Sequence, residues 1–138
     1  MLPLLVGCWL LFVPTEAAAD ALDRHAAAEI DHLLKHIKTS PCRFNRNGDW
    51  YEAAAAAEHI DRKYRYLLRH DRIDSAEDFI GQAAATSSIS GKEYLVQCPT
   101  GDVLTTADWL TVILAELRHR ESPDRRSPPT LKGSAPGR

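Results

Sequence analysis

The stretch that decides the fold is Phe44-Asn45-Arg46-Asn47-Gly48-Asp49-Trp50-Tyr51. Its central Asn-Gly pair is typical of a two-residue β-hairpin loop, because that loop needs positive φ at both positions, which Asn tolerates and Gly adopts freely. Alternation along the first strand places Cys42, Phe44 and Arg46 on one face. We therefore predict an antiparallel hairpin that runs directly into a helix, with Phe44 in the core.

Apolar residues recur at helical spacing on both sides of this hairpin and again near the C-terminus. They predict helices over residues 20–38 and 52–69, a short third helix after Ser75, and a last helix that Trp109 opens. Ser75 and the segment 105–108 (Thr-Thr-Ala-Asp) have the pattern of helix N-caps. The last helix is apolar over more than a third of its circumference, so we expect it to be the most buried helix.

Residues 92–98 and 103–104 are β-prone and add strands to the hairpin. The predicted fold class is therefore α+β, with about four helices packed on a small antiparallel sheet.

Length and composition indicate one globular domain. The chain has 138 residues, of which 44% are hydrophobic and 26% charged, and we assign residues 20–121 to the domain. A net charge of −2 creates no field that would attract nucleic acid. The basic and aromatic segment 62–72 is interpreted as a solvated helix face, because Glu58 and Asp61 stand at i,i+4 spacing from Arg62 and Arg65.

The N-terminus has the features of an export signal. Residues 2–13 form an apolar run too short to span a bilayer, and Ala17-Ala18-Ala19 matches a small-residue cleavage pattern. We expect a signal peptide over residues 1–19, a periplasmic or secreted mature chain, and no stable membrane insertion after cleavage. No Lys or Arg precedes the apolar run, and Leu5-Val6-Gly7-Cys8 resembles a lipobox, although apolar sequence continues beyond Cys8. Residues 122–138 are rich in Pro, Ser, Gly and Arg and are expected to form a disordered tail.

Removal of the signal leaves two cysteines, Cys42 and Cys98. A pair of cysteines in an exported chain favours a disulfide over a metal site or a nucleophile. The two residues are 56 positions apart, so loop-closure entropy predicts about 4 kcal/mol of stabilisation.

The first helix carries a polar stripe beside its apolar one, formed by His25, Glu29, His32 and His36. These residue types ligate Zn or Cu, which makes metal binding an alternative function. One straight helix usually supplies only two converging ligands, so we favour a solvated flank and expect neither a metal nor another cofactor.

The segment 86–91 (Thr-Ser-Ser-Ile-Ser-Gly) invites comparison with serine nucleophiles. It contains no G-x-S-x-G elbow, no S-x-x-K and no phosphate-binding loop, so a turn is the favoured interpretation. The alternative is a small hydrolase in which His59 acts as the base for a loop serine. We assign no catalytic residue.

Four blocks of the sequence, in this order, resemble one family: Phe44-x-Arg46-Asn47-Gly48 with Tyr51, Glu58-His59-x-x-x-Lys63-Tyr64, the segment 75–80, and the segment 87–94. Together they are similar to the YfeK-like family of small exported bacterial proteins, over roughly residues 30–117. That resemblance implies export and a compact α+β fold. The family is a domain of unknown function, so it supplies no catalytic residues. The chain departs from the family at Glu93, where proline is expected.

The polar members of these blocks form the candidate site, and two interpretations of them stay open. They join hairpin, helix and loop by hydrogen bonds and salt bridges, or they line a cleft that binds a small or peptidic ligand. As function we predict a non-enzymatic periplasmic binding or accessory protein whose partner is another periplasmic protein or a small ligand. The candidates are Arg46, Glu58, His59, Lys63, Ser88, Ser90 and Lys92.

Overall fold

The computed structural model describes residues 22–122 of the chain. Within that range the predicted α+β class is confirmed, with four α-helices, a short π-helix and one four-stranded antiparallel sheet. In chain order the elements are α1 (Arg24–Thr39), β1 (Arg43–Arg46), β2 (Asp49–Glu52), α2 (Ala53–Leu68), α3 (Ala76–Asp78), the π-helix η1 (Phe79–Ala84), β3 (Leu95–Gln97), β4 (Val103–Thr105) and α4 (Thr106–Glu121).

The sheet has the strand order β2-β1-β3-β4. β1 pairs antiparallel with β2, with Arg46 opposite Asp49, and on its other edge with β3. Asn47 and Gly48 connect β1 to β2 with φ values of 56° and 97°. Both values lie in the left-handed region, where Asn and Gly meet the least steric resistance. Arg46 at the end of β1 is thereby brought next to the N-terminal turns of α2.

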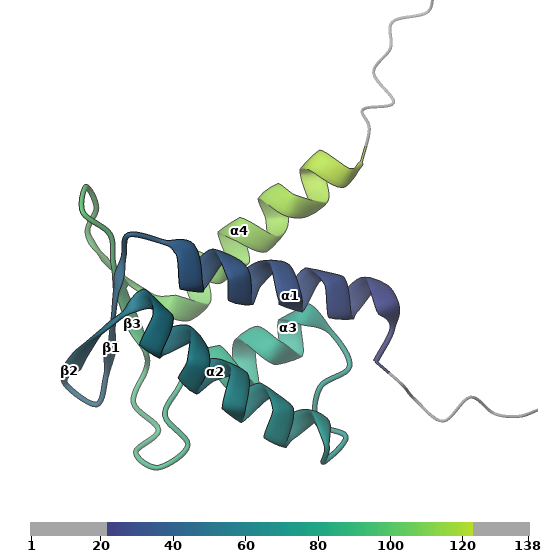
Figure 1. Cartoon of the computed structure of the whole chain (residues 1–138), viewed down its shortest axis with the longest axis horizontal. Coiled ribbons are helices and arrows are strands. Elements are labelled where there is room, and N and C mark those ends of the chain that lie inside the picture. The colour runs from purple at the N-terminus through teal and green to yellow at the C-terminus, as the bar shows by residue number, and fades with distance from the viewer. Residues whose placement is uncertain (1–21, 123–138) are drawn as a thin grey trace, which may run out of the picture.

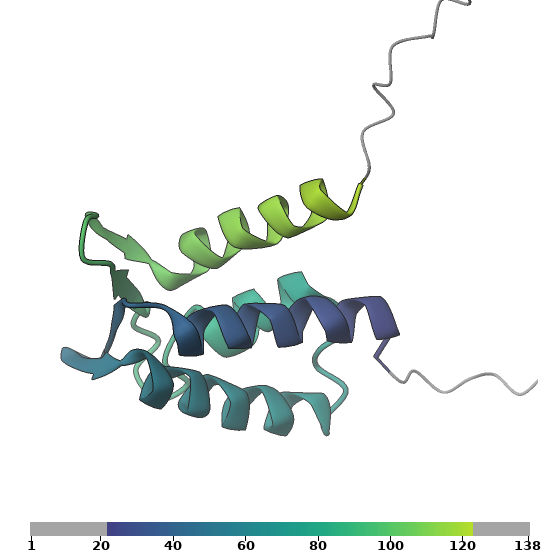
Figure 2. The ribbon, with the colours of Figure 1, turned by 45° about the horizontal axis from the view of Figure 1, so that its top comes forward.

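The helices extend from one end of the sheet. Figure 1 shows the sheet at one end of the molecule, with α1 and α2 running side by side away from it. In the view of Figure 2, α1 lies between α4 and α2. The element η1 packs against both α2 and α4 and closes the helical layer. The core therefore lies between the helices and continues to one face of the sheet.

The core consists mainly of apolar residues that recur at helical spacing or alternate along a strand. Ile30, Leu33 and Ile37 of α1 are fully buried, and Phe44 of β1 is buried as predicted. Phe79 of η1 is also fully buried and meets the ring of Tyr64 edge-on, with the ring centroids 5.5 Å apart. Such edge-to-face pairs add stability beyond the area that they bury.

The prediction that the last helix is the most buried was wrong. α4 buries Thr106, Leu110, Ile113 and Leu114, whereas Val112 is 57% exposed. α1 buries five residues, because α2 packs against one side of it and α4 against another (Figure 2). A wide apolar arc shows how much of a helix is suited to burial, and the number of neighbouring elements decides how much is buried.

The predicted caps are confirmed. The Ser75 hydroxyl accepts a hydrogen bond from the Asp78 backbone N–H at 3.1 Å, and the Thr105 hydroxyl accepts one from the Asp108 N–H at 3.1 Å. Each satisfies a backbone donor that the first turn of a helix leaves free.

The disulfide between Cys42 and Cys98 is confirmed. Cys42 precedes β1 and Cys98 follows β3, and the neighbouring residues Arg43 and Gln97 lie opposite each other in the sheet. The bond therefore holds together the β1–β3 pairing, the long-range strand contact of the fold.

Residues 1–19 with the expected signal peptide and Cys8, and residues 123–138 of the expected tail, lie outside the described range. Among the helices within residues 22–122, none is long and apolar enough to cross a membrane.

Candidate functional site

A cleft lies where the β1–β2 turn, α2 and the loop after η1 meet. It consists of two adjoining cavities that share Arg46, His59, Arg62 and Tyr94. We call the first the inner pocket; it has a volume of about 200 Å³ and is lined by Phe44, Asn45, Arg46, Tyr51, Ala55, Ala56, Glu58, His59, Ile60, Arg62, Tyr94 and Thr106. We call the second the mouth; it measures about 470 Å³ and adds Asn47, Lys63, Ser87, Ser88 and Ile89.

The helix α2 supplies the polar wall of the cleft. Positions i, i+3 and i+4 of a helix share one face, which brings His59, Arg62 and Lys63 to the same side. Glu58 lies one residue earlier and forms an ion pair with Arg62, at 2.6 Å between Oε1 and Nη1. Of the acidic side chains in the described range, Glu58 is the one that lines the cleft.

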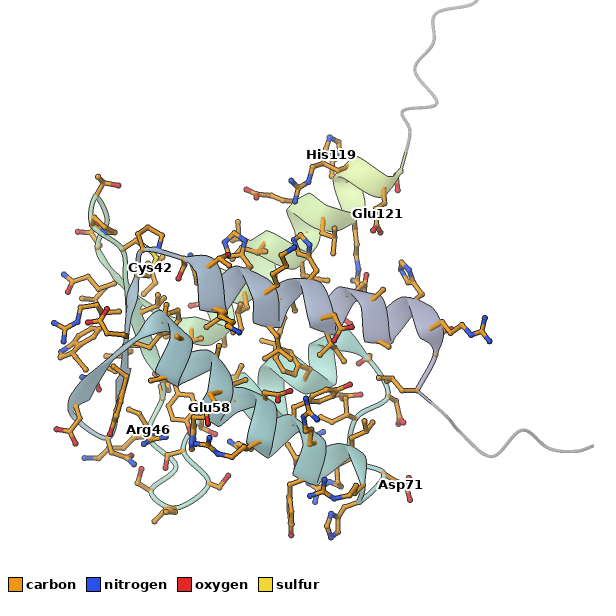
Figure 3. All side chains as sticks on the ribbon, in the orientation of Figure 1. Cys42, Arg46, Glu58, Asp71, His119 and Glu121 are labelled. Carbon is orange, nitrogen blue, oxygen red and sulfur yellow. A yellow bond between two sulfur atoms is a disulfide. The ribbon has the colours of Figure 1, made fainter. Side chains whose placement is uncertain are left out.

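The hairpin supplies the opposite wall. Arg46 stands at the end of β1, and its guanidinium carbon lies 4.6 Å from the centroid of the Tyr51 ring on β2. A guanidinium stacked on an aromatic face keeps its N–H edge available for a ligand. In Figure 3, Arg46 and Glu58 are close together at the end of the molecule that holds the sheet.

The serine loop, residues 86–91, is tied to the hairpin turn through one side chain. The amide of Asn47 donates a hydrogen bond to the Ser87 hydroxyl at 3.3 Å and accepts one from the Ser90 hydroxyl at 2.5 Å. Ser87 is buried, and its hydroxyl also accepts from the backbone N–H groups of Ile89 and Ser90. The loop is therefore held as a fixed wall of the mouth, which explains why a serine-rich segment occurs here.

The centre of the cleft is a three-residue contact between α2 and the segment before β3. His59 Nε2 and the Tyr94 hydroxyl are hydrogen bonded at 3.2 Å. Lys63 Nζ lies 5.5 Å from the centroid of the Tyr94 ring and donates to the backbone carbonyl of Thr86 at 2.5 Å. These contacts place a buried tyrosine, a half-buried imidazole and a half-buried ammonium at the junction of mouth and inner pocket.

The charges of the cleft favour neutral histidine and leave the site positive. Burial lowers the pKa of His59, and the nearby cations of Arg46, Arg62 and Lys63 lower it further. Burial also lowers the pKa of Lys63 and raises the pKa of Tyr94. Desolvation disfavours the charged form of each group, so His59 is neutral at pH 7 and carries a single ring proton.

Thr106, the first residue of α4, lies on the wall of the inner pocket and is fully buried. Its backbone N–H donates to the Tyr94 carbonyl at 2.8 Å. Its hydroxyl oxygen has no hydrogen-bond partner among residues 22–122. A buried hydroxyl without a partner costs free energy, so its persistence at a cavity wall calls for an explanation.

The structure brings most of the predicted candidates together. Arg46, Glu58, His59, Lys63 and Ser88 line the cleft. Ser90 holds the hairpin turn from outside it, and Lys92 is an exposed residue that lines neither cavity. Sequence reasoning missed Asn47, Tyr51, Tyr94 and Thr106 as cleft residues and placed Arg62 on a solvated face.

The histidine stripe of α1 is engaged differently from a metal site. Glu29 is 3% exposed and binds the guanidinium of Arg118 through both oxygens, at 2.6 and 2.9 Å. His25 Nε2 lies 3.3 Å from the same carboxylate, and the His36 ring lies 5.3 Å from that of Trp109 between centroids, tilted by 57°. Within residues 22–122 no three His, Cys, Asp or Glu side chains are arranged to hold a metal ion.

The hydrolase alternative finds no support in the contacts of the cleft. In the described part of the chain, His59 has no hydrogen bond to a serine, and its Nε2 is paired with Tyr94. Ser88 lines the mouth without a hydrogen bond to a base within that same part.

Two comparisons with known proteins give a match. Residues 24–118 match a family described as a family of unknown function, DUF5329. The chain is also 36% identical over 86 residues to the uncharacterised protein YfeK of Salmonella typhimurium, which covers 62% of this chain and 68% of that protein. No solved structure matches this chain.

Proposed function

The chain belongs to DUF5329, a family of unknown function. We propose that it is an exported, non-enzymatic protein that binds a small ligand in this cleft. The observation that carries the proposal is the half-buried side chain of Arg46, which lines both cavities of the cleft. Within residues 22–122 this side chain has no hydrogen bond and no carboxylate partner, and its guanidinium lies over the ring of Tyr51. A side chain needed only for bracing would be hydrogen bonded to the elements that it joins.

Other polar residues of the cleft do brace it. Asn47 ties the turn to the serine loop, and Lys63 ties α2 to Thr86, the first residue of that loop. Three chain segments are thus fixed around the cavity by specific hydrogen bonds. Binding sites are commonly preformed in this way, because preorganisation reduces the entropy lost on binding.

Export is supported by two independent features. The apolar run with Ala17-Ala18-Ala19 fits a signal peptide, and the disulfide of Cys42 with Cys98 suits an oxidising compartment. Mass spectrometry of protein purified from its native cells tests this part. We expect a chain that starts at Asp20 and is two hydrogens lighter than the reduced form; a retained leader with two free thiols contradicts it.

The binding role is tested by screening a panel of neutral, anionic and cationic fragments and short peptides against ¹⁵N-labelled protein, with amide shifts as the readout. We expect at least one compound to shift the amides of Arg46, His59 and Tyr94 together. A panel in which every shift falls outside the cleft contradicts the proposal.

A substitution at His59 separates binding from bracing. We expect His59→Gln to abolish those shifts and to lower Tm by less than about 4 °C, which corresponds to about 1 kcal/mol in a domain of this size. Lys63 is left unchanged in this test because its hydrogen bond braces the cleft. A drop of more than about 10 °C assigns His59 to bracing instead. Lys92→Met, on the exposed side of the serine loop, is the matched control and should change neither quantity.

A further inference from the structure

We propose that the ligand of this cleft is a small molecule with a flat apolar body and one anionic head group, of the chemical class of an aromatic carboxylate. The inference rests on the binding role proposed above and deepens it. In this arrangement the body enters the inner pocket and the head group stays in the mouth, between the hairpin and α2.

The inner pocket fits a ring in both size and lining. Its apolar lining consists of the rings of Phe44, Tyr51 and Tyr94 together with alanines and Ile60 of α2, and the polar residues that line it include Arg46 and His59. Phe44 and Tyr94 are buried. An apolar cavity of about 150 Å³ accepts benzene, and the inner pocket, at about 200 Å³, is slightly larger.

The mouth selects the charge of the head group. Three cations line it, Arg46, Arg62 and Lys63. Glu58 neutralises Arg62, while neither Arg46 nor Lys63 has a carboxylate within 4.0 Å in the described part of the chain. The guanidinium of Arg46 lies over the ring of Tyr51, and Arg46 lines both cavities where they join. A carboxylate at that point would receive paired N–H donors from Arg46 and the positive field of Lys63.

The same geometry excludes the other charge classes. A cationic head group would meet two cations without their own counter-ions in a partly desolvated site, where like charges repel strongly. A neutral head group would leave the charge of Arg46 unmatched. The preference is therefore anion over neutral over cation.

Three probes of one shape test this order. Benzoate, benzamide and benzylamine are titrated into ¹⁵N-labelled protein at pH 7, with the amide shifts of the cleft as readout. We expect benzoate to bind in the cleft and to have a Kd at least tenfold lower than benzamide, and benzylamine to cause no saturable shift there.

Variants assign the selectivity to the mouth. Arg46→Met should weaken benzoate binding about tenfold and leave benzamide binding within about twofold. Lys63→Met should act in the same direction, and provides an independent test should Arg46→Met lose its dispersed amide spectrum. Arg43→Met is the matched control, because Arg43 is on the same strand but faces away from the cleft, where it pairs with Glu52 at 3.2 Å. It should leave the affinities for benzoate and benzamide unchanged and should not create binding of benzylamine.

The outcomes separate this inference from the binding role. Benzamide or benzylamine binding as tightly as benzoate overturns the anionic class but leaves the binding role standing. Benzoate affinity that survives both Arg46→Met and Lys63→Met overturns the assignment of the head group. An absence of cleft shifts with all three probes overturns the aromatic class, and the fragment and peptide panel then decides the binding role by itself.

Discussion

Replacing Thr106 with valine tests whether the inner pocket holds an unsatisfied polar group. The hydroxyl is fully buried and unpaired within residues 22–122, and valine has nearly the same shape without the polar atom. Leaving a buried hydroxyl unpaired costs about 1–3 kcal/mol, so Thr106→Val should raise the free energy of unfolding by about 1 kcal/mol. Urea unfolding measures this change. With a slope of about 1–2 kcal/mol per molar for a small domain, the midpoint should rise by roughly 0.5–1 M at constant slope.

The neighbouring threonine is a control with the opposite sign. Thr105 caps α4 by accepting from the Asp108 N–H, so Thr105→Val should lower the free energy of unfolding by about 1 kcal/mol. Both variants make the same threonine-to-valine change, at adjacent positions. If Thr106→Val loses as much stability as Thr105→Val, the Thr106 hydroxyl is hydrogen bonded in the folded protein, which contradicts its description as an unpaired buried group.

Three further perturbations test the scaffold and the charges of the cleft. Replacing Cys42 and Cys98 together with serine should lower the free energy of unfolding by about 4 kcal/mol in urea titration, because the bond closes a loop of 56 positions. Arg118→Met should lower the free energy of unfolding by about 2–3 kcal/mol, measured by thermal unfolding, because Glu29 loses its bidentate partner. This cost is smaller than for a fully buried ion pair, because Arg118 is 43% exposed and solvent screens its charge. The lowered pKa of His59 means that the unfolded chain binds its proton more readily, so stability should fall as the pH drops through 6.5, and His59→Gln should flatten that dependence.

Each of these predictions has its own control. Excess reductant should give the wild type the stability of the double serine variant. Arg120→Met, exposed on the same helix as Arg118, should stay within about 0.5 kcal/mol of the wild type. His36 also has a pKa lowered by burial, so His36→Gln should remove a separate part of the pH dependence. Equal pH profiles for wild type and His59→Gln would contradict the burial of that imidazole.

Most of the fold was predictable because local signals agreed with one another. Helical spacing, the Ser75 and Thr105 caps and the cysteine pair each indicated the observed element or bond. The burial of α4 was not predictable, because it depends on which elements lie beside it. Leu104 and Val112, at 48% and 57% exposure, stand where no described element covers them.

The candidate site was predictable in its α2 and hairpin residues and not in its far wall. Arg46, His59 and Lys63 were selected as polar members of matched blocks, and they do line one cleft. Tyr94 was assigned only to the β-prone segment 92–98, and Thr106 appeared only as part of a capping pattern. Their place at the pocket depends on β3 returning beside β1, with β4 paired to β3, and the β1–β3 pairing is a long-range contact that no local pattern specifies.

The histidine stripe illustrates the same limit. The spacing of His25, Glu29, His32 and His36 correctly places them along one helix. What Glu29 binds was decided by Arg118, which is 89 positions away in the chain and also pairs with Glu77 at 2.6 Å. The local pattern therefore placed the four residues correctly on one helix. The partner of Glu29, however, is set by the tertiary fold.

The most direct test of the account is a crystal structure of the protein soaked with benzoate and with a neutral fragment of the same shape. The account predicts benzoate density in the cleft, with the ring between Phe44, Tyr51 and Tyr94 and the carboxylate against the Arg46 guanidinium. An inner pocket that is filled by its own side chains, with fragments bound only at other surfaces, would contradict it.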